Sequence, residues 1–244
     1  MRRHLKITGD AGSASVDRIP TGWSVDIDGP VDEANARELL RNALDAVADQ
    51  GGGLARLWVR GGEPEVTGAA RDLGFGEERS LHQLRRPLPV DEPWSLTVRP
   101  FVVGQDEDAW LAANNRAFSW HPEQGGWTRE DLAERFAEPW FDPNGFLLHE
   151  EDGQLLGFCW TKEHRDVEPA LGEIYVIAVD PAAGRTGLGG PLTLAGLDHL
   201  YRQGLRVGML YVDGSNVAAI KLYERLGFTV HQTDVAWTIE VTGR

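Results

Sequence analysis

Apolar residues recur along this chain with two different periods, and the changes of period predict its helices and strands. Residues 172–179 are almost all apolar, which is typical of a strand buried on both faces. A glycine-rich turn follows, and residues 188–202 are predicted as a helix. Residues 207–212 are predicted as a strand, residues 216–226 as a helix ended by Gly227, and residues 228–241 as a last strand or pair of strands.

The elements that precede this region are predicted in the same way. Residues 94–103 are predicted as a strand and residues 107–117 as a helix. Thr128 is the predicted N-cap of a helix over residues 129–136, because a threonine side chain can accept from the unpaired amides of a first turn. Residues 145–149 and 154–161 are predicted to form a hairpin around the turn Glu151-Asp152-Gly153.

An internal repeat links the two ends of the chain. At an offset of 153 residues the chain matches itself with eleven identities in an ungapped window of 37 residues. The match ends with Leu73-Gly74-Phe75 against Leu226-Gly227-Phe228, at the end of a predicted helix in each copy. So dense a match predicts a duplicated α/β unit.

The first copy is predicted to be shorter than the second. Its predicted elements reproduce only the rear half of the second copy's order; they cover residues 23–27, 34–48, 55–59, 67–73 and 79–85. Three prolines between residues 86 and 93 suppress regular hydrogen bonding there. We therefore expect a partial, non-catalytic domain over residues 1–88, a linker over 89–95 and a complete catalytic domain over 96–244.

Composition and charge exclude several classes of protein. With 24 basic and 38 acidic side chains, the net charge of −14 has the wrong sign for a nucleic-acid binder. The single cysteine, Cys159, excludes an internal disulfide framework and a cysteine-built zinc site, and it is expected to be a core residue of a strand. No apolar run reaches the ~18 residues that a membrane span needs, and the first residues resemble no export signal. We expect a cytoplasmic protein with no membrane partner.

The strongest local signal for function is a glycine-rich loop. Residues 179–190, with four glycines, connect a buried strand to a helix. Glycines let the backbone approach a ligand closely, and the first amides of a helix lack internal partners, so such a loop can bind a phosphate or pyrophosphate. The loop is neither a P-loop nor a dinucleotide fingerprint, because the residues that would complete those motifs are absent. A plain turn with tight helix–strand packing is the alternative.

The residues on both sides of this loop resemble the GNAT N-acetyltransferases. The resemblance is carried by residues 173–181 before the loop, and by Asn216, Tyr223 and Gly227-Phe228 after it. It covers about residues 96–240 and implies an α/β (α+β) fold, here tandem mixed sheets flanked by helices with a truncated first copy and a complete second copy. It also implies that the loop holds the pyrophosphate of acetyl-CoA.

Three further segments are similar to the mycothiol synthase family, whose members are tandem GNAT enzymes. They are residues 121–128 (HPEQGGWT), 138–143 (EPWFDP) and 156–162 (LGFCWTK). The resemblance implies acetylation of the cysteinyl amine of cysteinyl-glucosaminyl-inositol, a small thiol-bearing glycoside, with acetyl-CoA as co-substrate and no metal. We expect a monomer.

Two catalytic roles follow from the resemblance. Glu173 would be the general base for the acceptor ammonium, since only the free amine has a lone pair for the thioester. Tyr223 would be the acid that protonates the departing CoA thiolate. From the residues alone, Glu173 is equally the first polar residue of a strand, and Tyr223 is equally a helix aromatic that packs on the sheet.

The resemblance also implies a set of binding residues. The backbone of Ile177, Ala178 and Val179 would pair with the pantetheine arm, and one amide there would polarise the acetyl carbonyl. The pyrophosphate would lie on Gly184, Arg185, Thr186, Gly187, Leu188, Gly189 and Gly190, flanked by Asn216, Val217, Ala218, Ala219, Ile220 and Lys221. The acceptor would contact Glu123, Lys162, Glu173 and Tyr211, although Glu123 and Lys162 are equally typical of solvated surface charges.

Departures from the pattern leave two other functions open. The position of Gly184 usually holds glutamine or arginine in GNAT loops, and mycothiol synthases normally carry a complete first domain, whereas the front half of that domain is missing here. The first copy itself is expected to be structural, because it offers the carboxylates Asp32 and Glu33 where the glycine loop would be. One alternative is a GNAT enzyme that acts on another amine, such as a peptide N-terminus, an amino sugar or a polyamine. The other is a GNAT module that binds CoA without turnover.

Overall fold

The computed structural model describes residues 4–9, 11–119, 124–184 and 187–244. The chain forms two compact units, each described separately below. Unit 1 comprises Met1–Gln83, Val212–Asn216 and Val230–Arg244, and unit 2 comprises Leu84–Tyr211 and Val217–Thr229. The units are therefore not continuous in sequence. The division at residues 88–96, which follows the two sequence copies, stays a prediction.

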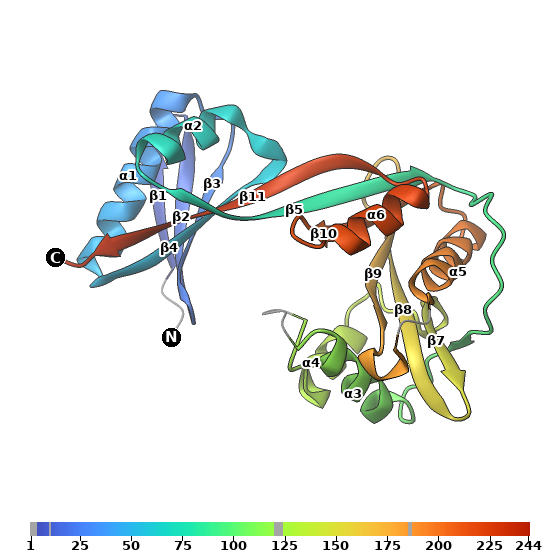
Figure 1. Ribbon diagram of the computed structural model, residues 1–244. Helices are drawn as coiled ribbons and strands as arrows, with labels where there is room; N and C mark the ends of the chain where they lie inside the picture. Colours follow the sequence, from blue (N-terminus) through green and yellow to red (C-terminus); the bar gives the residue numbers. More distant parts are fainter. Residues whose placement is uncertain (1–3, 10, 120–123, 185–186) are drawn as a thin grey trace. The chain divides into compact units, whose positions relative to one another are not determined.

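Unit 1 is a mixed sheet packed against two helices (Figure 1). Its strands are β1 (His4–Gly9), β2 (Gly12–Ile19), β3 (Gly22–Asp28), β4 (Gly52–Val59) and most of β11 (Thr229–Thr242), in the order β1-β2-β3-β4-β11. Strand β3 is parallel to β4, and β11 is antiparallel to β4. Its helices are α1 (Glu33–Asp49) and α2 (Pro64–Asp72), with the short helix η1 (Arg60–Gly62). Buried Trp23, Leu40 and Leu57 lie in the core between sheet and helices.

Unit 2 carries the glycine-rich loop. Its sheet has the order β10-β9-β8-β7-β6, from strands β6 (Arg99–Pro100), β7 (Phe146–Glu151), β8 (Gln154–His164), β9 (Leu171–Val179) and β10 (Val207–Asp213). Strand β5 (Gly76–Pro87), like β10, contributes residues to both units. The helices are α3 (Glu107–Ala117), α4 (Arg129–Phe136), α5 (Gly189–Arg202) and α6 (Val217–Arg225), with the short helices η2 (Pro143–Gly145) and η3 (Pro181–Ala183).

An aromatic cluster fills one face of the unit 2 sheet. Trp110 of α3 makes edge contacts, at ring-centroid distances of 5.3 to 5.9 Å, with Trp127, Phe146, Phe158 and Trp160. The opposite face is covered by α5, where Gly196 lies against Cys159 and Ile174. Residues 172–174 and Val176 of β9 are therefore buried, as the apolar run at residues 172–179 predicted, whereas Tyr175, Ile177, Ala178 and Val179 are only half-buried.

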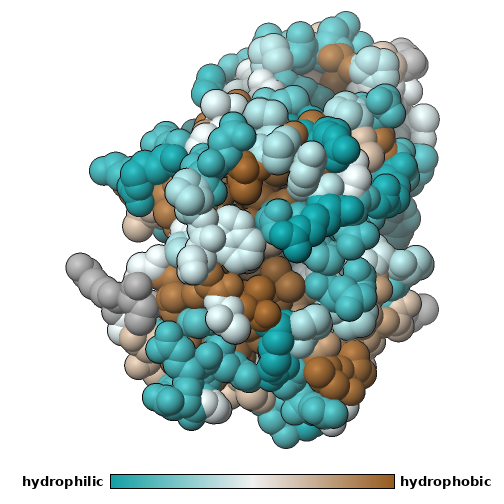
Figure 2. All heavy atoms as spheres, turned by 90° about the vertical axis from the view of Figure 1, so that its right-hand side faces the viewer, coloured by the Kyte–Doolittle hydropathy of each residue, from teal (hydrophilic) through white to brown (hydrophobic). Residues whose placement is uncertain are grey.

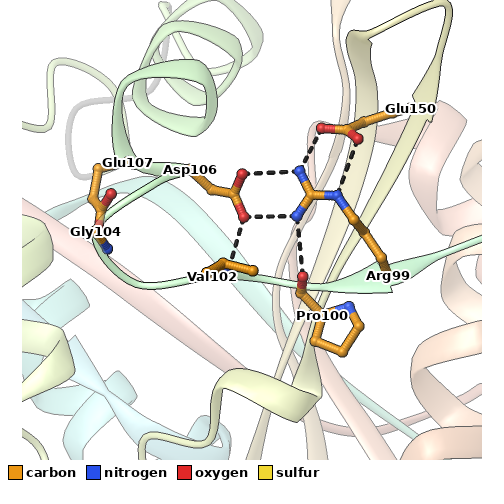
Figure 3. Close-up of polar contacts among 7 residues, drawn as sticks. All are labelled: Arg99, Pro100, Val102, Gly104, Asp106, Glu107 and Glu150. Carbon is orange, nitrogen blue, oxygen red and sulfur yellow. Dashed lines mark hydrogen bonds and ion pairs between the residues drawn. The ribbon is translucent and has the colours of Figure 1, made fainter.

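A cluster of charged residues fixes the segment that leads into α3. The guanidinium of Arg99 donates to Asp106 and to Glu150, and the Asp106 carboxylate also accepts from the amide of Val102 (Figure 3). The Arg99 guanidinium lowers the pKa of Asp106, because it stabilises the ionised carboxylate. This cluster joins β6, β7 and the start of α3 into one frame.

The structure confirms the repeat at its most similar point. Gly74 and Gly227 follow α2 and α6 with φ of 88° and 75°, a conformation that favours glycine. The next amide donates back to the helix in both copies, from Phe75 to the carbonyl of Ala70 and from Phe228 to that of Tyr223. The shared Leu-Gly-Phe sequence thus forms the same helix end twice.

Most predicted elements are present, one prediction was wrong and two strands were missed. The helix at Glu107–Ala117 has the predicted bounds, and Thr128 caps α4 through a reciprocal pair of hydrogen bonds with Asp131. The predicted strand at residues 94–103 is reduced to Arg99–Pro100, followed by a single further bond from the amide of Phe101 to the carbonyl of Phe146. Strands β1 and β2 were not predicted.

The surface of the molecule is mostly polar where it is seen in Figure 2, which shows the face on the right-hand side of Figure 1. Hydrophilic residues cover most of this face, and apolar residues reach the surface in smaller areas between them. Scattered apolar exposure of this kind is normal for folded proteins. In the part of the chain that the structure describes, no helix is long and apolar enough to cross a membrane.

Replacement of Gly196 with alanine is expected to destabilise the protein. A Cβ there would lie 2.5 Å from Sγ of Cys159 and 2.7 Å from Cδ1 of Ile174, so α5 would have to move away from the sheet. Overpacking costs roughly 1–3 kcal/mol, which exceeds the ~1 kcal/mol that alanine gains over glycine in a helix. Urea unfolding measures the loss. Gly76→Ala, with no such neighbour within 4 Å, is the control, and a Gly196→Ala variant as stable as wild type would contradict the packing.

Candidate active site

The most distinctive feature of unit 2 is an extra residue in β9. Trp160 of β8 pairs with Val176, but Thr161 pairs with Ile174, so Tyr175 has no partner residue on β8. Such a β-bulge bends the strand and changes which face the later side chains occupy. The bulge lies between Glu173 and the segment formed by Ile177, Ala178 and Val179.

Strand β9 also parts from its other neighbour at the bulge. Within the described residues, the parallel pairing with β10 runs from Leu171 with Val207 to Ile174 with Leu210. Strand β9 continues to Val179, so its edge from Tyr175 onward has no partner strand in β10. An unpaired strand edge presents backbone donors and acceptors to an extended ligand. Ile177, Ala178 and Val179, predicted to bind pantetheine, are half-buried on this segment.

Glu173 is a buried carboxylate with a single described partner. Its side chain is only 9% exposed, and its Oε2 lies 2.7 Å from Nε2 of His164 on β8. An ionised carboxylate only accepts, so Nε2 of His164 carries the proton of this hydrogen bond. Among the described residues, Oε1 of Glu173 makes no hydrogen bond. One oxygen is therefore held and the other is available.

Lys162 lies opposite Glu173 on β8 but is held by aromatic rings. The two residues are direct partners in the antiparallel register. The Nζ of Lys162 lies 4.7 Å from the ring centroid of Trp140 and 5.6 Å from that of Tyr175, within the range of cation–π attraction. Tyr175 in turn accepts a hydrogen bond at its hydroxyl from Nε of Arg135, and burial raises its pKa.

The glycine-rich loop begins at a buried acid. The Asp180 side chain is fully buried, accepts from the amide of Ala182 and forms a bidentate ion pair with Arg116 of α3. The Arg116 guanidinium lowers the pKa of Asp180. Further along, Gly184 has φ 72° and ψ −159°, a backbone conformation that is essentially reserved for glycine. The glycine that departs from the family pattern is therefore required by the local backbone.

The same loop leads into the N-terminus of α5. Leu188 precedes the helix with no side-chain cap, and the first internal bond recorded there runs from the amide of Leu192 to the carbonyl of Leu188. The amides of Gly189 and Gly190 are therefore first-turn donors with positive partial charge. Leu222 of α6 lies 3.2 Å from where a Cβ of Gly189 would be, so this glycine also permits close packing of the two helices.

Tyr223 is buried on α6, with its ring 5.8 Å from that of Phe228 in an edge contact. Burial raises the pKa of Tyr223, and the nearby Cys159 adds to the effect. Burial likewise raises the pKa of the Cys159 thiol, which is fully buried as predicted. The described contacts do not join Tyr223 to Glu173.

The structure brings some predicted residues together and leaves others apart. Glu173 and Lys162 are direct partners on the adjacent strands β9 and β8. Tyr211 lies on β10, where its side chain is 43% exposed. Val217, Ala218, Ala219, Ile220 and Lys221 lie on α6, but Asn216 belongs to the segment grouped with unit 1. Glu123, Arg185 and Thr186 lie outside the described residues. No group of metal-ligating side chains occurs among the residues that the structure covers.

Sequence reasoning did not find His164, Trp140 or Tyr175. His164 follows Lys162 by two positions, so strand alternation puts both on one face of β8. With the register of the β8–β9 pair, that alternation would have placed His164 beside Glu173. The bulge at Tyr175 leaves no comparable mark in the sequence.

Arg116 is expected to stabilise the loop only while Asp180 is ionised. A lowered pKa means that the stabilisation is complete above the ordinary carboxyl value of about 3.9 and is lost as the pH falls through the folded-state value. Arg116→Ala should therefore cost about 1–3 kcal/mol at pH 7 and progressively less below pH 4, measured by urea unfolding at each pH.

The matched control for this variant is Arg129→Ala. Arg129 pairs with Asp108, but the two side chains are 59% and 78% exposed, so its loss should change the stability little at either pH. Equal losses for Arg116→Ala at pH 7 and at pH 3 would show that the ion pair is not the source of the stabilisation.

Known proteins resemble this chain in sequence and in fold. The sequence model of the Acetyltransferase (GNAT) family matches residues 110–228. A mycothiol acetyltransferase of Thermobispora bispora is 51% identical over 216 residues, which are 85% of this chain and 71% of that protein. One of Mycobacteroides abscessus is 52% identical over 200 residues, 79% of this chain and 67% of that protein.

Among solved structures, a GCN5-related N-acetyltransferase from Sphaerobacter thermophilus has the same fold. It superimposes with a TM-score of 0.76 at 24% identity, over 96% of this chain and 78% of that one. The mixed α/β fold expected from the sequence is thereby confirmed. On these similarities, the chain belongs to the mycothiol acetyltransferase family of GNAT N-acetyltransferases.

Proposed function

We propose that this chain transfers the acetyl group of acetyl-CoA to the cysteinyl amine of cysteinyl-glucosaminyl-inositol, the precursor of mycothiol. The proposal is supported by the names of its relatives and by one observation in the structure. The buried carboxylate of Glu173 has one oxygen without a hydrogen bond to a described residue. It lies just before the bulge at Tyr175, where the unpaired edge of β9 begins. A base and a binding edge in adjacent positions suit an acyl transfer to an amine.

The described residues fit acetyl-CoA in two places. The β9 edge at Ile177, Ala178 and Val179 offers backbone groups for the amide-bearing pantetheine arm. The glycine loop and the first amides of α5 offer donors and positive partial charge for the pyrophosphate, with Lys221 exposed on α6. When bound there, acetyl-CoA supplies an acetyl group that is activated as a thioester.

Glu173 acts first in the proposed reaction. Its free oxygen, Oε1, takes a proton from the acceptor ammonium, which exposes the lone pair that forms the new C–N bond. An amide of the β9 edge donates to the carbonyl oxygen as negative charge develops on it. As the C–S bond breaks, Tyr223 gives its hydroxyl proton to the departing sulfur. Its raised pKa keeps that proton in place at neutral pH.

Mass spectrometry of the acceptor tests the proposal. The protein is incubated with acetyl-CoA and the cysteinyl-glucosaminyl-inositol precursor, with free cysteine, glucosamine and a short peptide as parallel acceptors. The precursor should gain one acetyl group, and Glu173→Gln should lower the rate by about 10²-fold or more while acetyl-CoA still protects the protein on heating. Acetylation of another acceptor alone would overturn the substrate assignment. Protection by acetyl-CoA without any acetylation would indicate a binding module.

Replacement of Tyr223 with phenylalanine tests the proposed acid. The variant keeps the ring that packs against Phe228 but cannot protonate the thiolate. Turnover should fall by about 10²-fold at every pH tested, because the raised pKa keeps the wild-type hydroxyl protonated. Cys159→Ser is the comparison, since the reaction needs no thiol from the enzyme. Unchanged turnover in Tyr223→Phe would show that Tyr223 only packs.

A further inference from the structure

His164 is the one charged or titratable side chain that the described contacts join directly to Glu173. Its Nε2 lies 2.7 Å from Oε2 of the carboxylate, and the two residues come from adjacent strands, β8 and β9. The His164 side chain is 25% exposed and that of Glu173 is 9% exposed. The hydrogen bond is therefore shielded from most of the water that would compete with it.

Lys162 does not take this role, although it lies directly opposite Glu173. Its Nζ is over the rings of Trp140 and Tyr175, and the described contacts include no ion pair between it and Glu173. A permanent lysine charge on the carboxylate would favour its ionised form and weaken it as a base. Histidine donates a hydrogen bond in its neutral form and so holds the carboxylate without that fixed charge.

The other charged groups near the His164–Glu173 pair interact with Tyr175 or with each other. Arg135 of α4 donates to the Tyr175 hydroxyl, and Glu138, just beyond α4, and Glu173 both act on it electrostatically. Glu163 and Arg165, the neighbours of His164 in sequence, pair with each other at 2.6 Å. None of these groups hydrogen-bonds to the Glu173 carboxylate within the described part of the chain, so His164 alone constrains it there.

We propose that His164 is the positioning residue of the catalytic base. Its Nε2–H holds Oε2 of Glu173, which leaves Oε1 for the acceptor ammonium. A glutamate has three rotatable side-chain bonds, and one charge-assisted hydrogen bond removes most of that freedom. The inference rests on the proposed function, because Glu173 needs positioning only if it acts as a base.

Steady-state kinetics at varied acceptor concentration test this role. His164→Ala should lower kcat roughly tenfold, because the carboxylate loses its orientation. The acceptor KM should change less than about threefold, because His164 is not proposed to contact the acceptor. If His164→Ala does not fold, His164→Leu keeps the volume without the donor and takes its place.

His164→Gln is the conservative variant that separates positioning from a structural role. Its amide can donate to Oε2. It should restore kcat to within about threefold of wild type. The matched control is Glu163→Gln, which changes the adjacent residue on the other face of β8 and should leave kcat and the acceptor KM unchanged.

Two results would overturn the proposal. One is a wild-type kcat in His164→Ala or His164→Leu, and the other is a His164→Gln variant as impaired as those two. Glu173→Gln distinguishes this failure from failure of the proposed function. If wild type acetylates an amine and Glu173→Gln slows it while the His164 variants do not, only the positioning role is wrong. If wild type acetylates no amine, the proposed function and this inference both fail.

Discussion

The geometry of the candidate active site depends on the β-bulge at Tyr175 in β9. At Tyr175 the strand carries one residue more than β8 needs, and at Ile174 its pairing with β10 ends. Before this point β9 is paired on both sides and places Glu173 in a buried position. After it, one edge of Ile177, Ala178 and Val179 is open. A single irregularity thus puts a shielded carboxylate beside a free backbone edge, and these are the two groups that an acetyl transfer to an amine requires.

Packing on the two faces of the sheet keeps that irregularity in place. The aromatic cluster around Trp110 fills one face, and α5 approaches the other closely at Gly196. The loop beyond β9 is fixed at its start by the buried Asp180 and its ion pair with Arg116. The positive φ of Gly184 and the uncapped N-terminus of α5 give this loop a backbone geometry with unpaired first-turn amides, which is the basis for proposing it as the pyrophosphate site.

Much of this arrangement could be predicted from the sequence, where the signal is local. The helix at Glu107–Ala117, the Thr128 cap and the repeated Leu-Gly-Phe helix ends each depend on a few consecutive residues. The bulge could not be predicted, because register is decided between strands and no residue type marks it. His164 was missed for the same reason: its importance lies in the cross-strand contact with Glu173. Strands β1 and β2 were missed although their signal is local: Leu5 and Ile7 in β1, and Ala14 and Val16 in β2, alternate with polar residues. Strand β1 lies at the edge of the sheet, and β2 pairs with both β1 and β3.

We propose that the pantetheine arm of acetyl-CoA pairs with the open edge of β9. Amide hydrogen exchange, measured residue by residue with and without CoA, tests it most directly. In residues 175–179, the amides that face away from β8 should exchange at least about tenfold more slowly when CoA is bound, because they gain hydrogen bonds, while β2 stays unchanged. Unchanged exchange along β9, with CoA binding demonstrated by calorimetry, would contradict the claim.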